Sequence, residues 1–323
     1  MNLIILMPIY NEEKQVPVTI EALLHLEGLE DCDYSLLMVD DGSKDNTWAA
    51  ICAGAEKYPG RVRGIHFSRN FGKESAICAG LDYADADAVI LMDGDLQHPP
   101  QYIPQMLDLW RQGYEIVEGV KTSRGKEGFF NKIMAKAFYG LFKKVAGYDL
   151  ENASDFKLLD KKVVRHWRSL REHNTFFRGL SQWLGFRRAS FPFVVADRQI
   201  GTSRFSVRNL FRLSLDAITA FSAVPLQLIT LIGFLFLLGS IILAIQTLIN
   251  FFMGSSAGGF PTVILIELTV GACVMISLGL IGTYISRIFD EVKDRPRYIV
   301  SDDTKDIYAD QKTDRVREED IPC

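Results

Sequence analysis

The stretch AVILMDGDLQHPP, residues 88–100, decides the fold class. Its five leading apolar residues predict a buried strand, and two aspartates follow at once. Short apolar runs elsewhere predict four more strands, and helical patterns separate them along the chain. The strands are expected at 3–7, 35–39, 62–67, 88–92 and 116–120, and the helices at 14–26, 46–58, 73–84 and 100–112. This alternation is typical of an α/β domain with a mostly parallel sheet covered on both faces.

Acidic side chains follow three of the first four predicted strands. Glu12 comes after the first, Asp40 and Asp41 end the second, and Asp93 and Asp95 follow the fourth. Ligands of such sheets bind at the carboxyl ends of the strands. Carboxylate oxygens suit Mg²⁺ or Mn²⁺, which often bind through one or two carboxylates plus substrate phosphates. The pattern therefore favours a site for a metal and a nucleotide-sugar diphosphate. Helix caps and Asp-rich turns are the alternative for each acid taken singly.

Composition excludes several classes of protein. The 323 residues are 48% hydrophobic and 24% charged, which excludes a disordered chain. The formal net charge of −4 argues against a nucleic-acid partner. The 5 cysteines are scattered and form no CxxC pair, as expected of reduced thiols. No GxGxxG follows the first strand, so a dinucleotide-dependent dehydrogenase is excluded. His98 is expected to be a polar loop residue and no metal ligand.

The last third of the chain contains two long apolar stretches without charge, 217–266 and 268–286. The core of the first, 226–252, and a second segment, 263–285, are each long enough to cross a bilayer core of about 30 Å, which takes roughly 20 helical residues. A buried helical hairpin in a soluble protein is the alternative. Basic residues flank the pair and are missing from the loop between them. The positive-inside rule then predicts a multi-pass protein of the inner (cytoplasmic) membrane with both termini in the cytoplasm.

These patterns divide the chain into four parts. We expect a cytoplasmic α/β domain at 1–204 and two membrane helices joined by a short loop at 224–288. Residues 205–223 carry apolar side chains at helical spacing with arginines on another face, which favours an interfacial helix. An ordinary amphipathic helix on the α/β domain is the alternative there. The cytoplasmic tail, 289–323, is expected to be mobile from Ser301 onward.

Four motifs carry a resemblance to a known family. MPIYNEE (7–13), VDDGSKDNT (39–47), SRNFGKE (68–74) and DGDLQHPP (93–100) occur in the order found in inverting glycosyltransferases of family 2. The set resembles in particular the polyprenyl-phosphate glycosyltransferases of the dolichol-phosphate mannose synthase and bactoprenol glucosyltransferase types. The segment 197–218, two spans and RPRYIV are similar to the bactoprenol type. The resemblance implies a GT-A (Rossmann-like) domain followed by two transmembrane helices.

The resemblance also implies roles for individual residues. Asp95 and Asp155 would be catalytic, and the metal would be surrounded by Asp93, Asp95 and Gln97. The nucleotide would be held by Pro8, Tyr10, Glu12, Asp40, Asp41 and Asp93. The acceptor phosphate would be bound by Lys121, Arg124, Arg198 and Arg204. Relatives commonly carry Arg at position 121 and Lys at 204, and these differ in bidentate geometry. Simple positive-inside charge is the alternative for Arg198 and Arg204.

The expected reaction is inverting transfer of a sugar, glucose from UDP-glucose as first choice, to undecaprenyl (polyprenyl) phosphate at the cytoplasmic face. A phosphate acceptor is largely ionised at neutral pH, so Asp155 is expected to orient groups more than to act as a base. The pathway implies a separate flippase and a downstream transferase, and a homo-oligomer is compatible with two spans per chain. The alternatives are a processive polysaccharide synthase, for which no QxxRW motif is present, and a non-catalytic nucleotide-sugar-binding scaffold.

Overall fold

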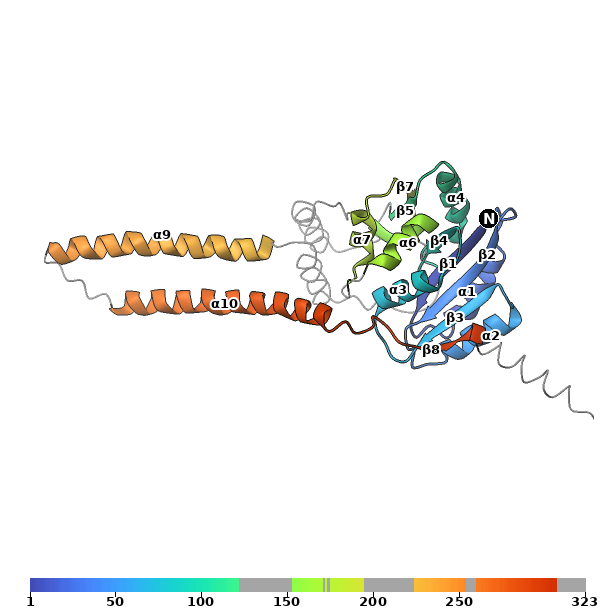
Figure 1. The fold of residues 1–323 in the computed structure, drawn as a ribbon, viewed down its shortest axis with the longest axis horizontal. Coiled ribbons are helices and arrows are strands. Elements are labelled where there is room, and N and C mark those ends of the chain that lie inside the picture. The colour runs from blue at the N-terminus through green and yellow to red at the C-terminus, as the bar shows by residue number, and fades with distance from the viewer. Residues whose placement is uncertain (122–152, 171, 173–174, 195–223, 254–259, 307–323) are drawn as a thin grey trace, which may run out of the picture. The chain divides into compact units, whose positions relative to one another are not determined.

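The computed structural model describes residues 1–121, 153–170, 172, 175–194, 224–253 and 260–306 (Figure 1). The described chain forms two compact units. One contains the sheet and includes the described residues from Pro296 onward. The other contains the two long apolar helices up to Arg295.

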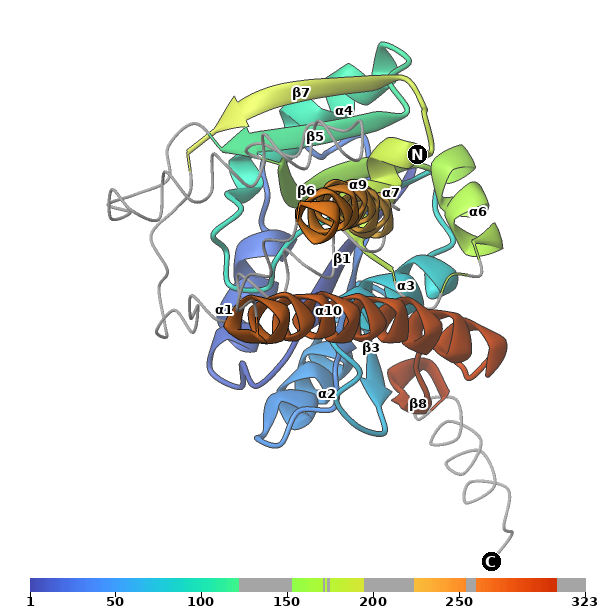
Figure 2. The ribbon, with the colours of Figure 1, turned by 90° about the vertical axis from the view of Figure 1, so that its left-hand side faces the viewer.

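One sheet of eight strands organises the first unit, in the order β7-β5-β6-β4-β1-β2-β3-β8. Neighbouring strands β4, β1, β2 and β3 are parallel, whereas β6 is antiparallel to both β4 and β5. Figure 2 shows β5 and β7 at one end of the sheet and β3 and β8 at the other. The strands are β1 (Asn2–Ile9), β2 (Asp33–Asp40), β3 (Val62–Phe67), β4 (Ala88–Leu91), β5 (Ile116–Lys121), β6 (Ala153–Asp160), β7 (Arg188–Phe193) and β8 (Val300–Asp303).

Helices cover both faces of the sheet, because alternate strand residues point to opposite sides. Leu3, Ile5 and Met7 of β1 belong to a core shared with α1 (Gln15–Leu24), α2 (Thr47–Lys57) and α4 (Ile103–Arg111). Leu6 points the other way, toward Gly80 of α3 (Lys73–Tyr83), where a Cβ would lie 2.0 Å from the leucine side chain. The remaining helices are the short η1 (Pro100–Tyr102), α6 (Lys161–Ser169) and α7 (Phe177–Trp183).

The structure confirms the five strands and four helical regions expected from the sequence, and with them the mostly parallel sheet covered on both faces. Continuous apolar runs identified the central strands because these are buried on both sides. The antiparallel strand β6 and the elements α6, α7 and β7 were not expected. They complete the half of the sheet that carries Asp155.

The segment after the apolar helices corrects the expected domain division. Residues 300–303 form β8, which pairs antiparallel with β3, so the expectation of a separate mobile tail is wrong for them. Arg63 contacts the buried Asp303 at two points, and Thr304 accepts a hydrogen bond from Gly64 N–H at 3.0 Å. The ring of Tyr298 stacks on Phe67 with centroids 5.2 Å apart. The chain thus returns from the second unit to supply an edge strand of the first.

The second unit consists of α9 (Val224–Phe252) and α10 (Phe260–Val292), which contact each other. Within them, Ile229–Asn250 and Thr269–Val292 are long and apolar enough to cross a membrane, with mean hydropathy of 2.4 and 1.7. Their large apolar side chains, such as Leu235 and Ile242, are exposed in the protein alone. The interfacial helix expected at 205–223 lies outside the described residues.

Candidate active site

Asp93 and Asp155 meet at the carboxyl edge of the parallel strands. Asp93 lies two residues after the end of β4, and β6 runs antiparallel beside β4 with Leu91 opposite Lys157. Extending that register by two residues places Asp155 opposite Asp93. Asp155 is only 5% exposed. The two acids are 62 positions apart in the sequence numbering, so the β4–β6 pairing is what brings them together.

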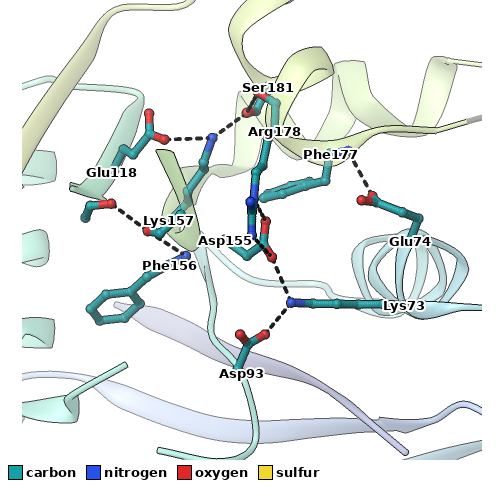
Figure 3. A network of polar contacts seen from close by, with 12 residues as sticks. Lys73, Glu74, Asp93, Glu118, Asp155, Phe156, Lys157, Phe177, Arg178 and Ser181 are labelled. Atoms are coloured by element: carbon teal, nitrogen blue, oxygen red, sulfur yellow. Dashed lines mark hydrogen bonds and ion pairs between the residues drawn. The ribbon is translucent and has the colours of Figure 1, made fainter. Parts of the chain in front are cut away.

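Lys73 joins these two carboxylates. It is the first residue of α3, and its Nζ lies 2.6 Å from Asp93 Oδ1 and 2.7 Å from Asp155 Oδ2. Figure 3 shows its side chain reaching across between the two acids. The lysine side chain remains 43% exposed. The site therefore has an ammonium group in contact with both acids, on a side chain that is partly exposed.

Arg178 of α7 holds Asp155 from the other side. Its Nε donates to Asp155 Oδ1 at 2.7 Å and its Nη2 to Oδ2 at 3.0 Å, a bidentate ion pair. One turn further along the same helix, the Ser181 hydroxyl accepts a hydrogen bond from the fully buried Lys157 at 2.7 Å. Lys157 also pairs with Glu118 of β5 at 3.2 Å. Two polar contacts thus fix α7 against β6 (Figure 3).

The charges around Asp155 determine its ionisation. Burial acts to raise the pKa of Asp155, but Lys73 and Arg178 overcome it and hold that pKa well below the usual range. Lys121 is the last residue of β5. The charges of Arg178, Lys73 and both acids act on its pKa. Burial and the charge of Arg178 lower its pKa. Asp155 is therefore a carboxylate at neutral pH, within a group of three cations.

His98 lies in the loop between β4 and η1, as expected of a polar loop residue, but it is buried. It is 2% exposed and stacks on Phe156 with ring centroids 5.2 Å apart. Its Nδ1 lies 3.0 Å from the Asp93 backbone N–H, which donates to it. Burial lowers the pKa of His98, which favours the neutral ring. The loop is buried because β6 and β7 bring Phe156 and Phe193 against His98.

The DGDLQ turn places Asp95 and Gln97 beside Asp93. Asp95 Oδ1 accepts a hydrogen bond from Gln97 N–H at 3.1 Å, which shapes the turn. Gly94 fits tightly, since a Cβ there would lie 2.2 Å from Ile9 Cδ1. Its carbonyl accepts from the Thr19 hydroxyl at 2.7 Å. A metal-binding role for Asp95 and Gln97 stays a prediction.

The two acids that end β2 are buried and bonded within the protein. Asp40 is 0% exposed and accepts hydrogen bonds from Ser43, while its other oxygen lies 2.7 Å from His66 Nδ1. Asp41 is 3% exposed and accepts from the backbone N–H groups of Phe71 and Gly72, and burial raises its pKa. In this structure both carboxylates shape loops, and their contact with a nucleotide stays a prediction.

Asp41 has a further consequence for the site. The loop that it holds, residues 70–72, leads directly into Lys73. Gly42 allows the close approach, because its φ is +63° and a Cβ there would lie 2.2 Å from the Arg69 carbonyl carbon. The VDDGS turn thereby positions the SRNFGK loop and, through it, the ammonium group between Asp93 and Asp155.

The other predicted nucleotide residues lie at the carboxyl end of β1. Pro8 lies within the strand, paired with Val39, and Tyr10 follows it with 37% exposure. The backbone N–H of Glu12 donates to the Thr47 hydroxyl at 2.8 Å, which ties the first loop to α2. Their nucleotide contacts stay predictions. Three predicted acceptor residues, Arg124, Arg198 and Arg204, lie outside the described residues.

The acidic residues can be tested for metal binding by their chemistry. Within the described ranges, no three His, Cys, Asp or Glu side chains form a group that could hold a metal ion by themselves. Asp93 and Asp95 nevertheless supply hard carboxylate oxygens on either side of one glycine. Mg²⁺ is usually held by one or two carboxylates together with substrate phosphates. The pair fits a divalent cation that arrives with a diphosphate.

Comparison with known proteins identifies the family. The model of Glycosyl transferase family 2 matches residues 4–168, which include the β1, β2 and β4 loops and Asp155. The chain belongs to glycosyl transferase family 2. With this match and the mixed sheet, the expected GT-A fold followed by two apolar helices is confirmed.

Relatives of this glycosyltransferase extend over nearly its whole length. It is 39% identical over 313 residues to the glycosyltransferase YkcC of Bacillus subtilis, covering 95% of this chain and 97% of the relative. It is 36% identical over 306 residues to the SfII prophage-derived bactoprenol glucosyl transferase of Shigella flexneri, covering 93% and 97%. Among solved structures, glucosyl-3-phosphoglycerate synthase from Mycobacterium tuberculosis with Mn²⁺, UDP and phosphoglyceric acid gives a TM-score of 0.48 at 18% identity, covering 67% and 76%. The sequence relatives confirm the resemblance to the bactoprenol type of the family.

Two basic residues of the site were missed by sequence reasoning. Lys73 belongs to the quoted motif SRNFGKE, so its position after the third strand was a signal that could have found it. Arg178 follows no predicted strand, and nothing in the local sequence relates it to Asp155. Both are recognised only once β6 and α7 are placed.

Proposed function

We propose that this glycosyltransferase transfers glucose from UDP-glucose to a polyprenyl phosphate at the cytoplasmic face of the membrane, with inversion at the anomeric carbon. The observation that carries the proposal is the extent of similarity to bactoprenol glucosyl transferases, 36% identity over 93% of the chain. That extent includes the apolar helices as well as the sheet unit. A lipid-bound acceptor and a membrane-bound enzyme are therefore proposed together.

The site chemistry supports transfer between two phosphate-bearing substrates. Lys73, Lys121 and Arg178 form a group of cations that interact electrostatically around Asp93 and Asp155. Ammonium and guanidinium groups bind and orient phosphate oxygens. Asp93 and Asp95 would hold Mg²⁺ or Mn²⁺ at the donor diphosphate, where the ion would stabilise negative charge on the leaving group.

Asp155 has a supporting role in this proposal. A polyprenyl phosphate has a second pKa near 6, so it is largely ionised and needs little help from a base. Asp155 is ionised and bonded to both Lys73 and Arg178, which makes it a poor proton acceptor. It orients these two cations so that their remaining N–H groups can face the phosphates. The phosphate oxygen then displaces the nucleoside diphosphate in a single step.

The membrane part of the proposal rests on the second unit. Its two helices expose apolar side chains that lipid would cover, and each is long enough to span. Arg287, near the end of α10, and Lys293, directly after it, favour a cytoplasmic location for that end of the helix. The product, a lipid-linked sugar on the cytoplasmic face, would require a flippase and a second transferase before it reaches a glycan.

The test is transfer of radiolabel from a panel of nucleotide sugars into organic-extractable lipid. The full-length protein would be purified in detergent and supplied with undecaprenyl phosphate and Mg²⁺ or Mn²⁺. We expect label from UDP-glucose in the lipid phase, lost in Asp95→Ala and retained in Asp108→Ala, which removes an exposed aspartate from α4. Lipid labelled from a different nucleotide sugar would show that this nucleotide sugar, and not UDP-glucose, is the donor. Label in insoluble polymer, or nucleotide binding without any transfer, would contradict the proposal.

A further inference from the structure

The two acids bridged by Lys73 differ in what else holds them. Asp155 has a second cation, Arg178, bonded to both of its oxygens. In the part of the chain that the structure describes, Lys73 is the one cation hydrogen-bonded to the Asp93 carboxylate. The other oxygen of Asp93 lies 3.9 Å from His98 Nε2, beyond hydrogen-bond distance. If Lys73 moved away, Asp155 would stay paired and Asp93 would lose its counter-ion.

We propose that Lys73 is an exchangeable counter-ion, which occupies Asp93 in the ligand-free enzyme and yields that carboxylate to the incoming divalent cation. The inference rests on the proposed function for the identity of the cation as the donor's Mg²⁺ or Mn²⁺. Its basis in the structure is the position of Lys73 Nζ, 2.6 Å from Asp93 Oδ1, where it occupies one of the oxygens that a cation at Asp93 would use.

The geometry allows such an exchange without moving the backbone. Lys73 begins α3, so its Cα is fixed by the helix, while its side chain is 43% exposed and has four flexible methylene groups. Asp93 is 31% exposed, so its carboxylate can be approached from solvent. After exchange, Lys73 keeps its bond to Asp155 Oδ2 and its other N–H groups turn to substrate phosphates. Lys73 would thus neutralise the charge of Asp93 in the ligand-free site and bind substrate phosphate after the exchange.

The exchange requires that Lys73 and the metal compete. Loss of a competing charged hydrogen bond is expected to change the affinity roughly tenfold, which corresponds to about 1.4 kcal/mol. Removing the ammonium group should therefore tighten Mn²⁺ binding to the ligand-free enzyme by roughly tenfold. Removing any nearby cation would also tighten Mn²⁺ binding somewhat, because it lowers the positive charge of the site. The control must therefore remove a cation that is close to the two acids and not bonded to Asp93.

Lys121 provides that control. It lies within electrostatic range of Asp93 and Asp155, yet no hydrogen bond joins it to Asp93 among the described residues. Lys57, an exposed residue of α2 paired with Glu21, controls for overall charge. The Lys73→Met and Lys73→Gln variants both remove the ammonium group, so the measurement survives if one of them fails to fold. Lys73→Arg keeps the charge.

The experiment measures Mn²⁺ binding by electron paramagnetic resonance to the full chain in detergent, without nucleotide or lipid. We expect Lys73→Met and Lys73→Gln to bind Mn²⁺ roughly tenfold more tightly than wild type, Lys121→Met to gain clearly less, and Lys57→Met and Lys73→Arg to match wild type. Adding Asp93→Asn should abolish the gain. Equal or weaker binding by the Lys73 variants, or an equal gain from Lys121→Met, would overturn the inference. This experiment measures metal binding and no sugar transfer. Failure of the transferase assay would therefore contradict the proposed function without deciding whether Lys73 competes with the metal.

Discussion

Arg178 contacts Asp155 at two points, with Nε 2.7 Å from Oδ1 and Nη2 3.0 Å from Oδ2. A planar guanidinium satisfies both carboxylate oxygens at once, which a lysine ammonium cannot do. Asp155 is thereby fixed in orientation before any substrate binds. The same carboxylate then positions Lys73, so one ion pair determines the placement of two cations.

Arg178→Lys should therefore impair the enzyme although it preserves the charge. We expect kcat to fall about tenfold or more, because a misplaced orienting group stabilises the transition state less. Each factor of ten in kcat corresponds to about 1.4 kcal/mol. The measurement is transfer of labelled sugar to lipid at saturating donor. Arg111→Lys, which alters an exposed arginine paired with Asp108 on α4, is the matched control and should leave kcat unchanged. Equal rates for the two variants would contradict the positioning role.

Asp155→Asn should reduce turnover by about 100-fold, since a neutral amide does not form an ion pair with Lys73 or Arg178. A 100-fold change in rate corresponds to about 2.7 kcal/mol in activation free energy. The measurement is the transfer rate at saturating donor and acceptor. Turnover within a few-fold of wild type would show that the carboxylate is dispensable.

Asp155→Asn should also change how the free energy of unfolding depends on pH. The folded-state pKa of Asp155 is depressed, so its ion pairs stabilise the protein above the unfolded pKa near 4, and that contribution is lost as pH falls through the folded value. The free energy of unfolding of Asp155→Asn should therefore lie below that of wild type at pH 7, and the gap should narrow in acid below about pH 4. If the difference in free energy of unfolding between wild type and Asp155→Asn stays constant down to strongly acid pH, the pKa of Asp155 is not depressed by its ion pairs.

The central sheet could be predicted from the sequence because its strands are buried on both faces. Continuous apolar runs such as AVILM identify such strands, and the acids after them mark the ligand edge. Strand β6 carries Lys157, which is 0% exposed and paired with Glu118. A lysine ordinarily indicates a solvated position, so the alternation in ASDFKLLD gave no clear strand signal. Only the fold shows that this lysine is buried.

The rest of the site depends on contacts between distant segments. Lys73, Asp93, Asp155 and Arg178 come from four separate elements, and no spacing in the sequence relates them. Strand β8 has the polar sequence VSDD, which lacks a strand pattern. It forms because the edge of β3 offers unpaired backbone groups and Arg63 a partner for Asp303. Tertiary context alone determines such an element.

Glu74 should make stability depend on pH in the opposite sense to Asp155. Its carboxylate accepts a hydrogen bond from Phe177 N–H at 2.8 Å, and burial, with the charge of Asp155, raises its pKa to about 7. A raised folded pKa means that the folded state holds the proton while the unfolded state has lost it, so stability falls as pH rises from about 4.5 to about 7. The penalty at alkaline pH is up to about 3 kcal/mol.

Glu74→Gln removes this penalty and keeps an oxygen to accept the Phe177 N–H. We expect the variant to match wild type near pH 5 and to exceed it in free energy of unfolding near pH 8. Denaturant titrations in detergent at the two pH values provide the measurement. Glu56→Gln, at an exposed position on α2, controls for the loss of a carboxylate. A stability gain for Glu74→Gln that is the same at both pH values would exclude the titration of Glu74 as its cause.

The return of the chain to the sheet can be tested with two adjacent aspartates. Asp303 is 6% exposed, accepts from Arg63 at 3.1 Å and 2.5 Å, and accepts from Lys305 N–H at 2.9 Å. Its neighbour Asp302 is exposed. Asp303→Ala should lower the free energy of unfolding of the sheet unit by about 1–3 kcal/mol, because Arg63 loses a charged partner. Asp302→Ala should change it by less than about 0.5 kcal/mol.

Hydrogen exchange would locate the effect of these substitutions. In Asp303→Ala we expect faster exchange at Ser68 N–H, which donates to Ile299, and at Gly64 N–H, which donates to Thr304. Exchange in β1 should stay unchanged, because β1 pairs with β2 and β4 in the middle of the sheet. If both aspartate variants unfold alike and exchange alike, β8 does not stabilise the sheet. A difference confined to β3 and β8 would show that the segment following α10 holds the edge of the catalytic domain.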